Sequence, residues 1–355
     1  MNQSLSPDFS DKTLTINSSH KDSEHKIGLV LAGGSAKGAY EAGALRYLAE
    51  INFAPHIIAG SNIGALNGAV IASYPDFSVA VEQLNILWDK LGSEKVLRLN
   101  PEAIKQVAYS GAKTFISTFQ SWFFDFISEI LIDGDKVSLF NPYTVEKLLK
   151  EAVKPSAIRS GKELWVAVFP ALKIPGINYD HLLGILTVLA GSSAKWLRVQ
   201  DCGDDELLYN LLLASAAIPF AFPPREINGK YYVDGALGDN VPLGALSKQG
   251  CTHAIVIHLE NAVTWNRYDF PEQAIIEIRP TQSLNKNQAL IAGDITSMLD
   301  FSSERISQLK QLGYEDAKYC LEPIRRTFTS LGELRLQDDI LRNKTEELQG
   351  DDPIW

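Results

Sequence analysis

The strongest constraint on the fold is the stretch Gly60-Ser61-Asn62-Ile63-Gly64, which stands between a strand-like segment and a run of small residues typical of a helix start. Glycines on both sides of a central residue allow the chain to leave a strand and enter a helix at once. The central side chain then stands exposed above the sheet on a strained backbone. We therefore expect Asn62 to occupy the apex of a sharp elbow, supported by Gly60, Ser61 and Gly64.

Strand and helix patterns alternate around this elbow. Residues 27–32 and 56–60 are largely apolar and strand-like, whereas 37–50 and 63–73 carry apolar residues at helical spacing. This order predicts an α/β fold, a three-layer sandwich with a central, mainly parallel sheet. Further predicted elements are an amphipathic helix around 79–91, a helix beginning at Pro142, strands over 164–169, 231–233, 254–259 and 275–278, and a helix from 298 that is closed by Gly313.

Length and composition favour one large domain over two. A chain of 355 residues with 45% hydrophobic content can bury a single extended core. Residues 1–25 are polar and unpatterned, and we expect a disordered leader without the apolar centre of a secretory signal. We place the main domain at 26–322 and a C-terminal tail with a short helix at 323–355.

Net charge limits the kinds of binding partner that we expect, and cysteine content indicates the redox compartment. A formal net charge of −10 argues against a nucleic-acid partner, which needs clustered Lys and Arg, but it leaves contact with a membrane surface open. Cys202, Cys251 and Cys320 are widely spaced, and we expect free thiols in a reducing compartment. His253 and His258 lie in or beside one strand and face opposite sides, so we expect a structural pair and not a catalytic dyad or a metal site. We expect no cofactor.

A glycine-rich loop follows the first predicted strand. Its residues are Gly33, Gly34, Ser35, Ala36, Lys37 and Gly38. A loop that leaves a strand and opens a helix presents unpaired backbone N–H groups, which suit an oxyanion. The middle glycine of the dinucleotide fingerprint is absent, and the lysine precedes the last glycine, so neither nucleotide-binding motif is satisfied. A purely structural tight turn is the alternative.

Asp234 stands at the end of the predicted strand 231–233 and is followed by Gly235. A lone Asp-Gly pair is usually a turn. With the glycine-rich loop and the elbow, however, it completes a set of three motifs. In this order and setting, the chain resembles the patatin-like phospholipases, lipid acyl hydrolases that use a Ser-Asp dyad without histidine. The resemblance runs from about residue 27 to residue 322.

The resemblance implies roles for these positions. It places the nucleophile at position 62, the general base at Asp234 and the oxyanion hole at Gly33, Gly34, Ser35 and Ala36. Two residues depart from the family pattern, because Ser35 replaces a third glycine and Asn62 replaces the serine. An asparagine amide is not nucleophilic at neutral pH. Ser61 is a poor substitute, since consecutive residues at a sharp turn point in different directions.

Two functions remain open. One is a lipid acyl hydrolase of the Ser-Asp type, acting on phospholipids or other esters, that Asn62 renders inactive. The other is a non-catalytic lipid-binding or regulatory protein of the same fold. In either case we expect Asn62 to hydrogen-bond Asp234, and we expect a cytoplasmic protein, with peripheral membrane contact left open. Residues 113–132 and 171–200 carry apolar segments that either pack in the core or contact lipid.

Overall fold

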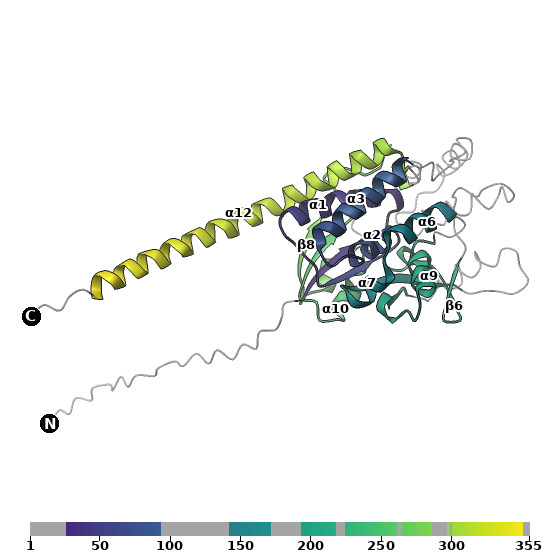
Figure 1. Ribbon diagram of the computed structural model, residues 1–355, viewed down its shortest axis with the longest axis horizontal. Helices are drawn as coiled ribbons and strands as arrows, with labels where there is room; N and C mark the ends of the chain where they lie inside the picture. The colour runs from purple at the N-terminus through teal and green to yellow at the C-terminus, as the bar shows by residue number, and fades with distance from the viewer. Residues whose placement is uncertain are drawn as a thin grey trace, which may run out of the picture.

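The computed structural model describes residues 26–93, 142–171, 193–217, 224–260, 265–285, 297–298 and 300–350 (Figure 1). The expected leader at 1–25, the apolar segment 113–132 and most of 171–200 lie outside the described residues. No helix within the described ranges combines the length and apolarity needed to cross a bilayer.

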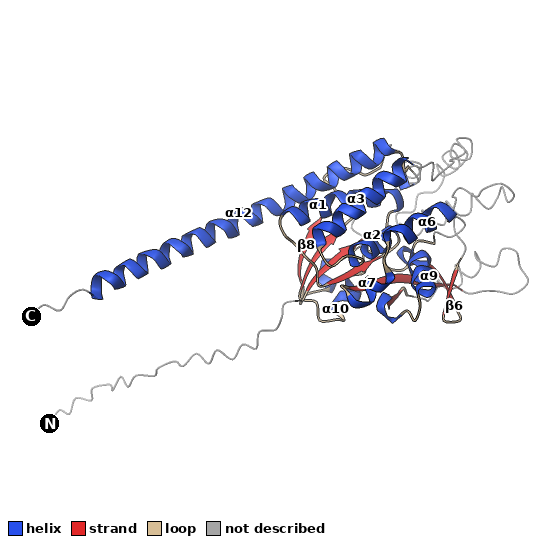
Figure 2. Cartoon of the chain, in the orientation of Figure 1, coloured by secondary structure: helices blue, strands red, loops and turns tan. Residues whose placement is uncertain are grey.

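A single mixed sheet forms the centre of the protein (Figure 2). Its parallel part runs in the order β3, β2, β1, β7, β8, and antiparallel strands β6 and β4 both pair with β3, with β5 beyond β6. The predicted α/β class with a mainly parallel sheet is confirmed. The strands are β1 Ile27–Leu31, β2 Ile57–Gly60, β3 Glu163–Ala171, β4 Lys195–Arg198, β5 Arg225–Ile227, β6 Lys230–Asp234, β7 His253–Ile257 and β8 Ala274–Ile278.

Helices cover both faces of this sheet. Side chains along each strand point alternately to the two faces, and apolar side chains on each face pack against helices. Toward one face, Leu31 and Ile58 lie against Gly68 of α2 (Ile63–Ala72). Toward the other, Gly28 lies against Leu246 of α10 (Leu243–Ser247). The remaining α-helices that the structure describes in the body are α1 Ala39–Glu50, α3 Phe77–Ser93, α6 Pro142–Ala152, α7 Pro155–Ser160 and α9 Asp205–Ser215.

Helix α12 (Ser303–Gly350) differs most from the sequence-based prediction. The predicted helix end at Gly313 is wrong, because the helix continues for another 37 residues, through the expected tail. Gly313 serves helix packing instead: a Cβ there would lie 1.9 Å from the Tyr40 carbonyl oxygen, and a Cβ at Gly43 would lie 1.9 Å from that of Lys310. Glycines on both helices therefore allow α1 and α12 to pack backbone against backbone.

Other predictions hold with small shifts. The helix expected from 37 begins with a short 3-10 turn at Ser35–Gly38 before α1, and α6 begins at Pro142 as predicted. Residues 195–198, at the end of the segment 171–200 that was expected either to pack in the core or to contact lipid, form strand β4, which pairs with β3. Cys202, Cys251 and Cys320 are all free.

Candidate functional site

The elbow forms at the carboxyl end of β2 with the strained geometry that the glycine pattern predicts. Asn62 has φ 51° and ψ −122°, in a region that few non-glycine residues adopt. A Cβ at Gly60 would lie 2.4 Å from the Gly64 carbonyl oxygen, and one at Gly64 would lie 2.4 Å from that of Leu31. Because backbone atoms cannot give way as side chains can, both positions require glycine for the chain to turn this sharply.

The Asn62 side chain is buried and joins three parts of the fold. Its Nδ2 donates a hydrogen bond to Oδ2 of Asp234. Its Oδ1 accepts from the backbone N–H of Ser35 at 3.1 Å and from that of Ile63 at 2.6 Å. The structure thus brings together the elbow, the glycine-rich loop and the Asp-Gly motif, and the asparagine amide bridges all three.

The glycine-rich loop after β1 is bent sharply at Ser35, whose φ is 53°. This left-handed backbone is one that glycine adopts most easily, which explains physically why a glycine suits this position. Gly33 is held differently: its N–H donates to Oδ1 of Asn240 at 3.0 Å, and its carbonyl accepts from Asn240 Nδ2 at 3.2 Å. The Ser35 amide is therefore directed at Asn62, whereas the Gly33 amide is bound to Asn240.

Asp234, the last residue of β6, is almost fully buried beside the elbow. Burial raises the pKa of its carboxyl from 3.8 to about 7, against the opposing hydrogen bonds from the Ala236 N–H and the Asn62 amide. The Ala236 N–H bond to Oδ1 measures 2.9 Å. A carboxyl group with this pKa can exchange a proton near neutral pH, which is the property required of a general base.

Two residues that hold the site had no assigned role in the sequence. Ser215, the last residue of α9, accepts the Asn62 N–H at 3.1 Å and donates to the Ala167 carbonyl at 2.6 Å. Asn240 fixes Gly33 as described above. Both lie in the stretch of chain around Asp234, so proximity to Asp234 in sequence could have suggested them, but only the tertiary structure brings Ser215 to Asn62, 153 residues away.

The remaining candidates occupy supporting positions. Ser61 is fully buried, and its Oγ has no hydrogen-bond partner among the described residues. Lys37 is buried, and the Gly38 carbonyl accepts from Asn67 Nδ2 at 3.1 Å. A Cβ at Gly235 would lie 2.1 Å from the Ala167 carbonyl oxygen, so a side chain there would displace Asp234 from β3.

A second buried polar group lies behind the glycine-rich loop. Glu41 of α1 is fully buried and accepts from Asn67 Nδ2 at 2.8 Å, while Asn67 Oδ1 accepts from the Trp88 indole at 3.1 Å. Burial raises the pKa of Glu41 well above its ordinary value, although the bonds from Asn67 and from the backbone of Ala32 oppose this. The hydrogen bond from Asn67 to Glu41 therefore ties α1 to α2 beneath the loop.

The histidines lie away from this cluster. His258 is buried just beyond β7, with its Nε2 3.2 Å from Oε2 of Glu277, and His253 is exposed. Burial and the nearby Arg279 lower the pKa of His258 to about 4, although Glu277 opposes this. The described part of the chain contains no group of three or more His, Cys, Asp or Glu side chains arranged to hold a metal ion.

A glycine-rich loop, an elbow and a carboxyl group that meet at the carboxyl ends of a mainly parallel sheet define an α/β protein built around a sharp strand-turn-helix elbow. The sequence profile of the patatin-like phospholipase family matches residues 29–247, well over half of the chain. The chain therefore belongs to the patatin-like phospholipase family, as the sequence motifs predicted.

Curated relatives carry the same family name. A patatin-like phospholipase domain-containing protein of Caenorhabditis elegans is 45% identical over 62 residues, which cover 18% of this chain and 4% of that protein. One of Cryptococcus neoformans is 24% identical over 246 residues, covering 64% of this chain and 23% of the relative. The chain thus spans less than a quarter of the length of these two relatives.

Solved structures that are similar to this chain include VipD from Legionella pneumophila, with a TM-score of 0.41 and 14% identity over 84% of this chain and 67% of VipD. Human GIVD cytosolic phospholipase A2, solved with the inhibitor methyl gamma-linolenyl fluorophosphonate, has a TM-score of 0.39 and 11% identity over 85% of this chain and 59% of that chain.

Proposed function

We propose that this chain is a patatin-like lipid acyl hydrolase domain that is inactive as it stands, because Asn62 replaces the nucleophile. The supporting observation is that the Asn62 side-chain amide makes hydrogen bonds to two parts of the site. The side chain at the nucleophile position occupies both the carboxyl group of Asp234 and the N–H group of Ser35. The base and the oxyanion donor are therefore bound to the group that replaces the nucleophile.

The chemistry that the scaffold would support follows from these positions. With a serine at position 62, the hydroxyl oxygen would attack the ester carbonyl carbon while Asp234 accepts the hydroxyl proton. The carbonyl oxygen would become an oxyanion facing the Ser35 N–H and its neighbours in the loop. Collapse would release the alcohol with the proton from Asp234, and water activated by Asp234 would then hydrolyse the acyl-enzyme ester.

The chain as it stands lacks the first of these steps. An amide nitrogen is not nucleophilic. Ser61 carries a hydroxyl group, but it is buried, and among the described residues its Oγ makes no hydrogen bond to Asp234.

A non-catalytic, lipid-binding or regulatory role on the same scaffold is the second candidate. It is favoured by the satisfied hydrogen bonds of Asn62, which make the site stable without substrate. The ligand class is a lipid or another acyl ester in solution or at a membrane surface, and this chemistry requires no cofactor.

Restoring the nucleophile tests the proposal. The unmodified chain should show only background hydrolysis of chromogenic short-chain esters and phospholipids, and Asn62→Ser should hydrolyse them measurably. Adding Asp234→Ala to that variant should lower its rate by about 10²–10⁴-fold, the usual contribution of a general base. Asn62→Ala is the matched control, because it also frees Asp234 and Ser35 but supplies no hydroxyl.

Two results would contradict the proposal. Turnover by the unmodified chain that survives both Asn62→Ala and Ser61→Ala would place the nucleophile elsewhere. A folded Asn62→Ser protein that hydrolyses no ester over a broad panel would favour the non-catalytic candidate, in which the surroundings of position 62 have also lost their function.

A further inference from the structure

The glycine-rich loop is anchored at both ends by asparagine side chains. At its start, Asn240 binds both the N–H and the carbonyl group of Gly33. At its end, the Gly38 carbonyl accepts a hydrogen bond of 3.1 Å from Nδ2 of Asn67, a buried residue of α2. Ser35, whose N–H is the proposed oxyanion donor, lies between the two anchors. The position of this donor therefore depends on a short span of chain that is held at two points.

The hydrogen bonds of Asn67 fix the direction of its amide. An indole N–H can only donate, so the Trp88 side chain, 3.1 Å away, requires the Asn67 oxygen on its side. The amide nitrogen then faces two acceptors, the Gly38 carbonyl and Oε2 of Glu41, the latter at 2.8 Å. Both amide hydrogens and the oxygen are engaged, and a reversed amide would lose all three bonds.

The end of the loop is also enclosed by side chains. A Cβ at Gly38 would lie 2.6 Å from Cγ1 of Ile63 and 3.0 Å from Cζ2 of Trp88. Ile63 and Asn67 are four residues apart, so they lie on the same face of α2. Since α2 begins directly after the elbow, one helix carries both position 62 and the anchor of the loop. The helix thereby sets the distance between them.

This distance matters for the proposed function, because ester hydrolysis needs the nucleophile and the oxyanion donors in a fixed arrangement. In the unmodified chain the Asn62 oxygen itself binds the Ser35 N–H, but a serine at position 62 lacks this amide oxygen. We propose, resting on the proposed function, that Asn67 is a positioning residue that holds the loop so that the Ser35 N–H faces the oxyanion. Glu41 and Trp88 act through Asn67 by fixing its amide.

Amide hydrogen exchange on the unmodified chain tests the anchor without catalysis. Asn67→Leu keeps the approximate size of the side chain and removes its hydrogen bonds. Exchange at the Ser35 and Lys37 amides should then become about tenfold faster relative to exchange in β1. Trp88→Phe removes only the indole donor and should give a smaller increase at the same two amides.

Ser73→Ala is the matched control. Ser73 is buried at the end of the same helix, where its Oγ binds the Ala69 carbonyl and the Lys154 N–H. This variant should lower the stability of the protein and leave exchange at Ser35 unchanged. Folded Asn67→Leu and Trp88→Phe proteins with unchanged exchange in the loop would overturn the proposal. Equal acceleration by Ser73→Ala would also overturn it, because the loop would then respond to any loosening of α2.

Kinetics in the Asn62→Ser background test the consequence for the reaction. Adding Asn67→Leu should lower kcat for a short-chain aryl ester by about 10²-fold, the loss expected from a displacement of about 1 Å, and should leave KM nearly unchanged. Adding Ser73→Ala should change neither constant. A rise in KM at constant kcat would contradict a role in the transition state. If Asn62→Ser hydrolyses no ester, the proposed function fails, and hydrogen exchange still decides whether Asn67 holds the loop.

Discussion

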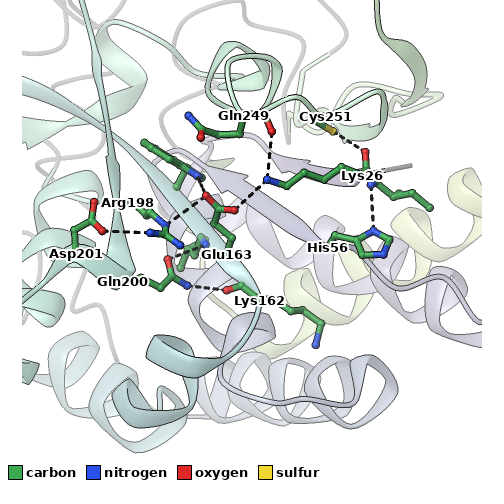
Figure 3. A network of polar contacts seen from close by, with 12 residues as sticks. Lys26, His56, Lys162, Glu163, Arg198, Gln200, Asp201, Gln249 and Cys251 are labelled. Carbon is green, nitrogen blue, oxygen red and sulfur yellow. Dashed lines mark hydrogen bonds and ion pairs between the residues drawn. The ribbon is translucent and has the colours of Figure 1, made fainter. Parts of the chain in front are cut away.

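The two ends of the central sheet carry polar clusters with opposite properties. At the carboxyl ends of β1 and β2, Asn62 and Asp234 form a buried pair of an amide and a carboxyl group. At the amino ends, Glu163 lies 3.1 Å from Lys26 Nζ and 3.4 Å from Arg198 Nε in a partly exposed network (Figure 3). Both clusters join segments distant in sequence, but only the first excludes water.

Exposure decides how each carboxyl group ionises. Burial dominates at Asp234 and raises its pKa to about 7. At Glu163, burial would also raise the pKa, but hydrogen bonds from Trp165 and Lys26 and the charges of Lys26 and Arg198 together lower it. The comparison shows that one sheet carries a buried hydrogen-bonded pair at the candidate site and partly exposed ion pairs at its opposite edge.

The largest effect is expected from a charge placed at the buried end. Asn62→Asp should destabilise the protein at pH 8 by about 2–4 kcal/mol, because two carboxyl groups then share one buried site and the donor to Asp234 is lost. The loss should shrink at pH 5, where protonation removes the repulsion. Urea unfolding at both pH values measures it.

The matched control for this substitution is Asn228→Asp. Asn228 has the same φ of 51° but lies in an exposed turn. This variant therefore replaces an asparagine by an aspartate on a left-handed backbone without burying the new charge. We expect it to change stability little at either pH. Equal effects of the two substitutions would show that backbone strain, and not burial of charge, governs position 62.

Removing the buried ionisable group should have the next largest effect. The folded pKa of Asp234, about 7, lies above the ordinary value of 3.8, so the protein loses stability as pH rises through this window. Asp234→Asn removes this pH-dependent loss of stability and should stabilise the protein at pH 9 by about 1–3 kcal/mol. This gain is smaller than the full pKa shift implies, because an asparagine side chain has one acceptor oxygen and cannot accept the hydrogen bonds from both the Ala236 N–H and the Asn62 amide in the same way.

The sign of this effect should reverse in acid. Below about pH 3 the carboxyl group is largely neutral in both states, so Asp234→Asn should there be slightly destabilising. Chemical unfolding at several pH values between about 3 and 9 gives the difference directly. A variant that is less stable than the unmodified protein throughout this range would show that hydrogen bonding outweighs desolvation at Asp234.

The smallest effect is expected at the amino ends of the strands. Glu163→Gln should destabilise the protein by about 1 kcal/mol or less at pH 7, since partly exposed ion pairs contribute little. The lowered pKa means that this contribution is present above the ordinary value of 4.5 and is lost as pH falls below it. It should also diminish at high salt.

Glu226→Gln, on an exposed residue of β5, is a suitable control for this change of side chain. Thermal unfolding at low and high salt distinguishes the two variants. A loss at Glu163 as large as that at Asn62, insensitive to salt, would contradict the distinction between the two ends of the sheet.

Much of the fold could be predicted because its signals are local. Apolar runs predicted β1, β2, β7 and β8 to within two residues of their observed ends, and the flanking glycines predicted the strained backbone at Asn62. Strand β4 and helix α9 went unpredicted. Strand β4 is only four residues long, and its pairing with β3 depends on tertiary contacts more than on its own apolar pattern.

Gly313 shows where local rules fail. Glycine often ends a helix, yet here it lies inside α12 because the close approach of α1 leaves no space for a side chain. The partners of Asn62 show the same limit, since Ser215 binds its N–H from 153 residues away. Neither relationship has a pattern within one segment.

The sequence by itself determined the α/β class, the elbow at Asn62, the glycine-rich loop and the absence of a nucleophilic group at the apex, because each depends on residues adjacent in the chain. Only the tertiary structure decided that the Asn62 amide binds both Asp234 and Ser35, that Asp234 is buried enough to hold its proton near neutral pH, and that α12 passes over α1 and beyond it. The physical reason is that dihedral preferences and apolar periodicity act over a few residues, whereas burial and hydrogen-bond partnership depend on which strands and helices come together.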